Sequence, residues 1–123
     1  MNIEDFGTGI DVEEISRFEK YTKDRSNPFL SRVYTDKEID YCFKNNFPSR
    51  HLAVRFCAKE AVYKAFCSVG ITDLSFKDIE IINDLNKVPC AVLNTEKTAG
   101  YSCKLSLSHS KDTAVASVVV VKL

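Results

Sequence analysis

The sequence predicts an α+β fold, with N-terminal helices packed on a mostly antiparallel β-sheet. Before residue 70, helix-capping signals precede stretches whose apolar residues recur three or four positions apart. Beyond residue 75, apolar and polar residues alternate as in half-exposed strands. The chain has 123 residues, 45% of them hydrophobic, and contains no repeat and no Pro/Gly/Ser-rich linker. A chain of this size can bury one core, so we expect residues 1–123 to form a single domain with one active site.

The first predicted elements are a short strand and two helical stretches. Residues 8–12 form a strand-like segment, and a helical stretch follows to about Tyr21. Next, Asn27 is a good N-cap and Pro28 a good first helical residue for a helix over residues 29–34. These signals place the first helices directly after a strand.

Two longer helices are predicted to follow. Thr35-Asp36-Lys37-Glu38 has the pattern of a capping box, which would open a helix to about Asn46. Ser49 would cap a longer helix that reaches about Val69. Gly70 stands where a glycine favours the end of a helix. The helical half of the chain should therefore end at this glycine.

The remaining sequence predicts strands joined by turns. Residues 75–82 alternate, which predicts a strand with Glu80 on its exposed face. A turn leads to a second strand over residues 89–93. Two more strands, over residues 103–109 and 114–122, are separated by a short turn. We therefore expect the sheet to be mostly antiparallel.

Charge is unevenly distributed along the chain, although 17 Lys/Arg balance 17 Asp/Glu overall. From Arg17 to Lys64 there are 11 Lys/Arg against 6 Asp/Glu, which leaves 6 against 11 elsewhere. A locally basic surface on a neutral protein suits recognition of phosphates or of an acidic protein, whereas general nucleic-acid binding usually needs a basic domain. Helices that simply collect Lys and Arg would give the same asymmetry.

The cysteines and the apolar runs predict a soluble cytoplasmic protein. The five cysteines are odd in number, widely spaced, and form neither a C-x-x-C nor a Cys/His zinc pattern, so we expect buried reduced thiols. The N-terminal residues lack the pattern of a signal peptide. The longest apolar run, residues 114–121, is too short to cross a bilayer, so no membrane partner is expected.

The helix predicted over residues 50–69 has little surface left for solvent. Its large apolar residues and its small ones lie on opposite sides, which confines its interior charges to narrow flanks. These charges are Arg55, Lys59, Glu60 and Lys64. Glu60 and Lys64 are spaced for a simple i,i+4 ion pair, which is the alternative to a functional role.

Asp11 and His109 are further candidates, each with an ordinary structural alternative. Asp11 precedes a helical stretch and would serve as its N-cap, with Glu13 and Glu14 complementing the helix dipole. His109 ends an alternating strand and would serve as a hydrogen-bonded core histidine. Spacing alone therefore assigns no reaction to these residues.

Three motifs stand out: Gly9-Ile10-Asp11 followed by Arg17, then Arg55-Phe56-Cys57-Ala58-Lys59-Glu60-Ala61-Val62-Tyr63-Lys64-Ala65, and Leu105-Ser106-Leu107-Ser108-His109-Ser110. Together they resemble the holo-acyl-carrier-protein synthase type of 4'-phosphopantetheinyl transferase. The resemblance covers nearly the whole chain, and its most specific part is the central F-x-x-K-E-A-x-x-K-A block. It implies an enzyme that moves the 4'-phosphopantetheine arm of coenzyme A onto a serine of an acyl carrier protein and releases 3',5'-ADP.

The resemblance implies three catalytic residues and a metal. Asp11 and Glu60 would hold Mg²⁺, an ion that takes one or two carboxylates together with substrate phosphates. Glu60, directly or through water, would accept the proton of the carrier serine. Lys64 would lie against the phosphates and stabilise or protonate the leaving group.

The resemblance also implies surfaces for two substrates and for further copies of the chain. Coenzyme contacts are expected at Arg55, Lys59, Lys64, Pro89, His109 and Ser110. The acidic carrier protein is expected to face Arg17, Lys20 and Arg25, with Lys23 near them. Relatives of this length are usually trimers with coenzyme bound between subunits, so we expect a homotrimer.

Two departures from the family pattern leave alternatives open. Asn86-Lys87-Val88-Pro89 replaces the G-K-P turn beside the adenosine and has no glycine, so a non-catalytic coenzyme- or carrier-binding module of the same fold is the main alternative. Asp11-Val12-Glu13 resembles the D-x-E of larger two-lobed transferases, whose second carboxylate also binds metal, but we expect Glu13 on the helix surface. An RNA-binding domain is less favoured, because a glycine-aromatic RNA motif and net positive charge are both lacking.

Overall fold

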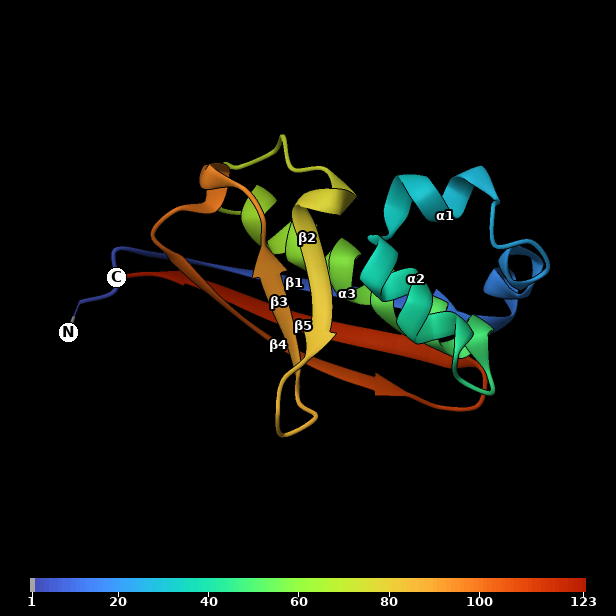
Figure 1. The fold of residues 1–123 in the computed structure, drawn as a ribbon. Helices are drawn as coiled ribbons and strands as arrows, with labels where there is room; N and C mark the ends of the chain where they lie inside the picture. Colours follow the sequence, from blue (N-terminus) through green and yellow to red (C-terminus); the bar gives the residue numbers. More distant parts are fainter. Residues whose placement is uncertain (1) are drawn as a thin grey trace.

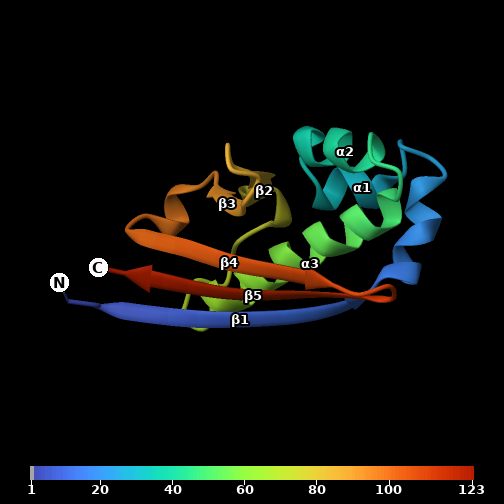
Figure 2. The same ribbon diagram turned by 90° about the horizontal axis from the view of Figure 1, so that it is seen from below.

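The first and last strands of the chain lie side by side in a three-stranded antiparallel sheet. In the computed structural model, which describes residues 2–123, β1 (Asp5–Glu14) pairs with β5 (Thr113–Lys122), and β4 (Tyr101–His109) pairs with the other side of β5. Figures 1 and 2 show both termini at the same end of this sheet. The C-terminal strand β5 is therefore the middle strand of this sheet, and its pairing with β1 brings the two ends of the chain together.

The long helix α3 (Pro48–Cys67) lies directly against β1, because two glycines leave room for its backbone. Alternate residues of β1 are buried, among them Gly7 and Gly9. A Cβ at Gly9 would overlap the carbonyl oxygen of Ala61, and one at Gly7 would overlap that of Ala65. Larger residues would push strand and helix apart. The same alternation buries the carboxylates that follow in β1.

Three short helical segments precede α3 and lie at the end of the molecule far from the termini, as Figures 1 and 2 show. They are η1 (Ile15–Thr22), α1 (Pro28–Val33) and α2 (Asp36–Phe43). The first is a 3-10 helix that starts only at Ile15, because β1 continues to Glu14. The strand predicted over residues 8–12 is therefore confirmed but is longer than expected.

The caps predicted for α1 and α2 are confirmed. The Asn27 side chain accepts a hydrogen bond from the backbone N–H of Phe29 at 2.9 Å. Thr35 and Glu38 form a reciprocal capping box, in which each side chain accepts from the backbone N–H of the other residue. These bonds satisfy amide groups that a helix leaves unpaired at its N-terminus.

The ends of α3 agree only in part with the prediction. Ser49 is not the cap, because the helix already begins at Pro48, a residue suited to the first helical position. At the other end Gly70 has a φ of 90°, which favours glycine. The N–H groups of Gly70 and Ile71 donate to the carbonyls of Cys67 and Phe66, each at 3.0 Å, and so stop the helix as predicted.

The hairpin β2 (Ile79–Asn83) and β3 (Pro89–Leu93) forms a second sheet. The predicted strand over residues 75–82 is shorter than expected, since η2 (Phe76–Asp78) occupies its first part. Glu80 is buried and not exposed as the alternation predicted. Its carboxylate accepts a hydrogen bond from the Thr35 hydroxyl at 2.6 Å, which compensates for its loss of water. A further short helix, η3 (Glu96–Thr98), connects β3 to β4.

The turn between β2 and β3 closes without a glycine. Lys87 takes the left-handed conformation, with a φ of 63°. The Asp84 carboxylate accepts from the N–H groups of Asn86 and Val88 at 2.8 and 2.9 Å, and the Asp84 carbonyl accepts from that of Lys87 at 2.9 Å. An aspartate side chain thus organises the turn that a glycine would otherwise form.

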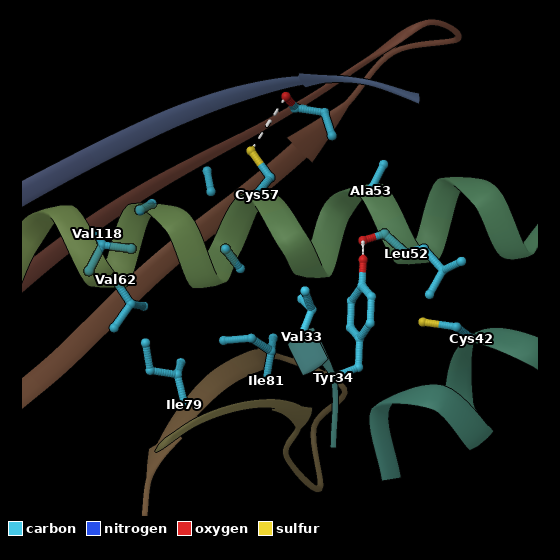
Figure 3. Close-up of a cluster of buried hydrophobic side chains, with 14 of the residues drawn as sticks. Val33, Tyr34, Cys42, Leu52, Ala53, Cys57, Val62, Ile79, Ile81 and Val118 are labelled. Atoms are coloured by element: carbon cyan, nitrogen blue, oxygen red, sulfur yellow. Dashed lines mark hydrogen bonds between the residues drawn. The ribbon is translucent and has the colours of Figure 1, made fainter. Parts of the chain in front are cut away.

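The core lies on both sides of α3, as the two-sided apolar pattern predicted. On one side are the buried valines of β5, and on the other Ile79 and Ile81 of β2 point toward the helix (Figure 3). Figure 3 also shows the buried Tyr34, whose hydroxyl donates to the Leu52 carbonyl at 2.7 Å. The predicted α+β class is confirmed. None of the helices within residues 2–123 is long and apolar enough to cross a membrane.

Candidate functional site

Two carboxylates of β1 face α3 immediately after the glycine contact. Asp11 and Glu13 are 9% and 8% exposed, and their spacing of two residues places them on the same face of the strand. Asp11 lies inside β1 and is therefore not the N-cap of η1, whose cap residue is Glu14. Glu13, expected on a helix surface, is instead buried beside Asp11. The sequence signal for this placement is that Asp11 and Glu13 follow Gly9 at intervals of two residues, which puts all three on one face of a strand.

Glu60 and Lys64 approach these carboxylates from α3. The Lys64 ammonium lies 3.1 Å from Asp11 Oδ1 and donates to the Ile10 carbonyl at 3.1 Å. Lys64 therefore pairs with Asp11, and the alternative i,i+4 ion pair with Glu60 is not formed within residues 2–123. Glu60 is half-buried, and none of the described side chains forms an ion pair with it. Of the expected catalytic residues, Asp11, Glu60 and Lys64 are thus brought together.

Negative charge dominates this cluster. Burial is the main cause that raises the pKa of Glu13 to about 7, and the neighbouring Asp11 carboxylate adds to it. Burial also raises the pKa of Glu60, helped by the charge of Asp11 and opposed by Lys64. Both glutamates would hold their charge more easily beside an additional cation.

The donor set suits a magnesium ion. Asp11 Oδ2 is buried and has no hydrogen-bond partner among the described residues, which leaves a carboxylate oxygen free to bind a cation. Mg²⁺ prefers such oxygens and usually keeps waters or substrate phosphates as its remaining ligands. The described part of the chain offers no set of three or more His, Cys, Asp or Glu arranged to hold a metal. Two carboxylates completed by substrate oxygens fit this arrangement.

A cavity of about 420 Å³ opens beside Glu60. Its lining combines apolar side chains with one acid and one base: Arg32, Glu60, Tyr63, Leu74, Ser75 and Phe76. Such a lining suits a ligand that is mostly apolar but carries charge at one end. The motifs identified Glu60, whereas the loop residues of this wall have no sequence signal of their own.

Arg55 lies at a second cavity, of about 210 Å³, between α2, α3 and β2. Its guanidinium is 3.8 Å from the ring centroid of Tyr41, and its Nε is buried without a hydrogen-bond partner among residues 2–123. Asn83, which also lines this cavity, is the strand partner of Pro89. Of the expected coenzyme residues, Arg55 therefore lines this cavity, and Pro89 lies beside one of its lining residues.

His109 and Ser110 lie at the exposed end of the β4–β5 hairpin. His109 is thus not the core histidine of the structural alternative. Burial lowers the pKa of His51 of α3, and the nearby Arg55, Arg50 and His109 add to this effect. Positive groups therefore gather around the first half of α3.

Lys59 does not face either cavity. It is 0% exposed and its ammonium lies 2.7 Å from the Glu38 carboxylate. It also donates to the carbonyls of Phe76 and Ile79, at 2.8 and 2.6 Å. These three partners use all three donors of the ammonium. The structure therefore gives Lys59 an internal role in place of the expected contact with coenzyme.

The residues expected at the carrier protein lie around η1 and α2. Arg17 pairs with Glu13 at 3.2 Å but stays largely exposed. It lines a shallow hollow together with Phe18, Lys20, Tyr21, Phe29 and Phe56. Arg25 pairs with Asp40 and lies over the ring of Phe43. Arg17 and Lys20 thus share one surface, with Arg25 tied to a neighbouring helix.

Comparison with known proteins gives consistent relatives over nearly the whole chain. A family model described as the 4'-phosphopantetheinyl transferase superfamily matches residues 7–119. A curated holo-(acyl-carrier-protein) synthase from Geobacter sp. (strain M21) is 39% identical over 122 residues, covering 94% of this chain and 97% of that protein.

Solved structures agree with these sequence relatives. The holo-(acyl-carrier-protein) synthase of Bacillus anthracis, in complex with coenzyme A (3',5'-ADP), is 35% identical with a TM-score of 0.78, covering 95% of this chain and 96% of that one. The enzyme of Helicobacter pylori in complex with coenzyme A is 35% identical with a TM-score of 0.74, covering 92% and 98%.

The raised pKa of Glu13 predicts a pH dependence of stability in metal-free buffer. Below about pH 4.5 this carboxyl is protonated in both the folded and unfolded states, whereas up to about pH 7 only the folded state retains the proton. The free energy of unfolding should therefore fall as pH rises through this window. Glu13→Gln should remove part of the fall, on the order of 1 kcal/mol.

Urea denaturation at pH 5 and pH 8, with EDTA present, measures this difference. Glu14→Gln is the matched control, because Glu14 is the exposed neighbour on the opposite face of β1. Equal pH dependence in Glu13→Gln and the wild-type protein would contradict the assignment.

Proposed function

The chain belongs to the 4'-phosphopantetheinyl transferase superfamily, and from this premise we infer that it transfers the 4'-phosphopantetheine group of coenzyme A to an acyl carrier protein. The family expected from the motifs is thus confirmed. The main structural support for locating the active site is the cluster of Asp11, Glu60 and Lys64, of which Glu60 lines a cavity. Five free cysteines fit the reducing cytoplasm.

In the proposed reaction the hydroxyl oxygen of a carrier serine forms a bond to the phosphorus that bears the pantetheine arm. The bond from that phosphorus to the bridging oxygen breaks, and 3',5'-ADP leaves with the electron pair. Glu60 accepts the serine proton, directly or through a water molecule. Lys64, on the same face of α3, offers positive charge to the leaving phosphate.

Asp11 and Glu60 would hold Mg²⁺, whose chemistry is to offset negative charge on the pyrophosphate. Among residues 2–123, Asp11 Oδ2 has no hydrogen-bond partner and Glu60 has no ion-pair partner, which supports this pair as ligands. Glu13 lies close enough to share their charge, and we assign it to the support of Asp11. Arg55, Pro89, His109 and Ser110 are proposed to contact the nucleotide part of the coenzyme.

A transfer assay tests the function directly. The protein is incubated with coenzyme A, Mg²⁺ and an unmodified acyl carrier protein, and the carrier is weighed by mass spectrometry. We expect the mass of one phosphopantetheine group to be added. Glu60→Gln should lower the rate at least about a hundredfold while the protein stays folded, because its amide cannot accept the proton.

The control is Glu14→Gln, which removes an exposed carboxylate outside the cluster. If several unmodified carriers gain no mass while the protein binds coenzyme A, the chain is a non-catalytic binding module. Unchanged turnover in Glu60→Gln would remove Glu60 from the reaction.

The hollow around Arg17 is proposed as the docking surface for the carrier protein. Its floor is aromatic, with the rings of Tyr21 and Phe29 stacked at 4.0 Å, and its rim carries Arg17 and Lys20. An acidic helix with some apolar side chains would match both parts. The hollow shares Arg17 with the carboxylate cluster through its pair with Glu13.

Arg17→Ala should therefore raise the KM for the carrier protein about tenfold and leave the KM for coenzyme A nearly unchanged. Steady-state kinetics with each substrate varied in turn measures the two constants. Lys122→Ala, which removes an equal charge from the far end of the sheet, should alter neither. Equal changes in both constants for Arg17→Ala would refute the docking role.

The outer face of the sheet supports a homotrimer. On this face Phe6, Ile10, Val12 and Val119 are between 42% and 63% exposed, which is a large apolar area for a monomer to leave in water. Arg55 lines a cavity separate from the one beside Glu60, and His109 and Ser110 are exposed at the end of the β4–β5 hairpin, so a neighbouring subunit would bring the parts of the site together. We therefore propose that copies of the chain associate through this face.

Val119→Asp should disrupt the assembly, because it places a charge at the centre of that face. Sedimentation velocity should give three times the chain mass of 13.9 kDa for the wild-type protein and a smaller species for the variant. Leu85→Asp, at the fully exposed tip of the β2–β3 hairpin, is the control and should stay trimeric. A monomeric wild-type protein would contradict the proposal.

A further inference from the structure

One wall of the Glu60 cavity is an irregular segment, residues 72–76, which we call the strap. Three of its residues, Leu74, Ser75 and Phe76, line the cavity opposite the helix residues Glu60 and Tyr63. Apart from the start of η2 at its end, the strap has no regular secondary structure. Its position therefore depends on contacts from other elements.

The strap is held through its backbone carbonyls by three side chains. The Tyr63 hydroxyl donates to the Thr72 carbonyl at 3.2 Å, and the Lys97 ammonium donates to that of Asp73 at 2.8 Å. The Lys59 ammonium donates to the carbonyl of Phe76 at 2.8 Å. The first two contacts are exposed to water, whereas Lys59 is completely buried.

The Lys59 anchor is rigid because each of its partners is fixed in turn. The Glu38 carboxylate that faces Lys59 also accepts from the N–H groups of Thr35 and Ile81, at 2.8 and 2.7 Å. Lys59 additionally donates to the Ile79 carbonyl at the start of β2. Because the Lys59 and Glu38 side chains are both 0% exposed, these bonds hold α3, α2 and β2 together from within the core.

We propose that Lys59 is a positioning residue that sets the width of the Glu60 cavity by fixing the strap, and that this cavity holds the pantetheine arm. The proposal rests on the proposed function. The arm is attached to the phosphorus that is attacked beside Glu60, so it must leave that point along an adjoining surface. An extended chain with amide groups and an apolar middle fits the largely apolar lining, and about 420 Å³ is within the usual range for small-molecule sites.

This role differs measurably from a direct contact between Lys59 and the coenzyme phosphates. A direct contact would strengthen binding of 3',5'-ADP, which keeps phosphates but lacks the arm. A positioned strap would strengthen binding of coenzyme A alone. The ratio of the two affinities therefore separates the two roles.

The test measures dissociation constants of coenzyme A and of 3',5'-ADP by calorimetry, in Mg²⁺ and without carrier protein. The main variant is Glu38→Gln combined with Lys59→Met, which keeps side-chain length and leaves no unpaired buried charge. We expect coenzyme A to bind about tenfold more weakly, and 3',5'-ADP to bind within about twofold of the wild-type value.

A second variant, Lys97→Met, removes the exposed anchor at Asp73 without disturbing the core. It should raise the dissociation constant of coenzyme A about threefold and leave that of 3',5'-ADP unchanged. If the buried double variant fails to fold, this variant alone decides the test. Val118→Ala, a core substitution on β5 away from the strap, is the stability control and should not alter the ratio.

Equal losses for both ligands, or no loss for either, would overturn the positioning role while the proposed function stands. If the wild-type protein fails to bind coenzyme A at all, the proposed function itself is refuted. Weaker binding of coenzyme A, with unchanged binding of 3',5'-ADP, supports the positioning role of Lys59.

Discussion

The backbone contact between α3 and β1 is the constraint on which the site depends. Gly7 and Gly9 allow the helix to lie on the strand, since a Cβ at either position would collide with a carbonyl oxygen of α3. Because β1 alternates, Asp11 follows on the same face and meets the helix where Lys64 lies. A side chain at either glycine would move the strand carboxylate away from Glu60. The two glycines therefore determine how far Asp11 of β1 lies from Glu60 and Lys64 of α3.

The other side of α3 is fixed by charge and not by close approach. Lys59 and Glu38 form a buried ion pair, and loss of one partner of such a pair typically costs about 3–5 kcal/mol because the other charge is left without compensation. A well-packed apolar pair could stabilise the core as well, so stability alone does not explain the lysine. Its bond to the Phe76 carbonyl does, because it connects the residue next to Glu60 with the opposite wall of the cavity.

The sequence predicted local structure well wherever a short motif determines it. The capping residues and Gly70 act through bonds to their near neighbours, so their roles are visible in the order of residues. Ser49 failed as a cap because Pro48 already starts the helix. The motif located Glu60, and helical spacing places Lys59 among the large apolar residues of α3, but its ion-pair partner 21 residues earlier is not revealed by a local motif. Glu13 was misplaced because β1 extends further than its strand-like residues indicated.

Ion pairs connect the buried carboxylates of β1 to the two ends of the basic segment, Arg17 and Lys64. Each buried carboxylate of β1 is paired with a cation that we propose to face a substrate: Lys64 with Asp11, and Arg17 with Glu13. A divalent cation bound by Asp11 would compete with Lys64 for the same carboxylate, so we expect the lysine to turn toward the phosphates only when metal and coenzyme are both present. Among the described residues Glu60 forms no such ion pair, and in the proposed function the metal ion is its cation. The three carboxylates therefore divide their roles according to which cation each one has.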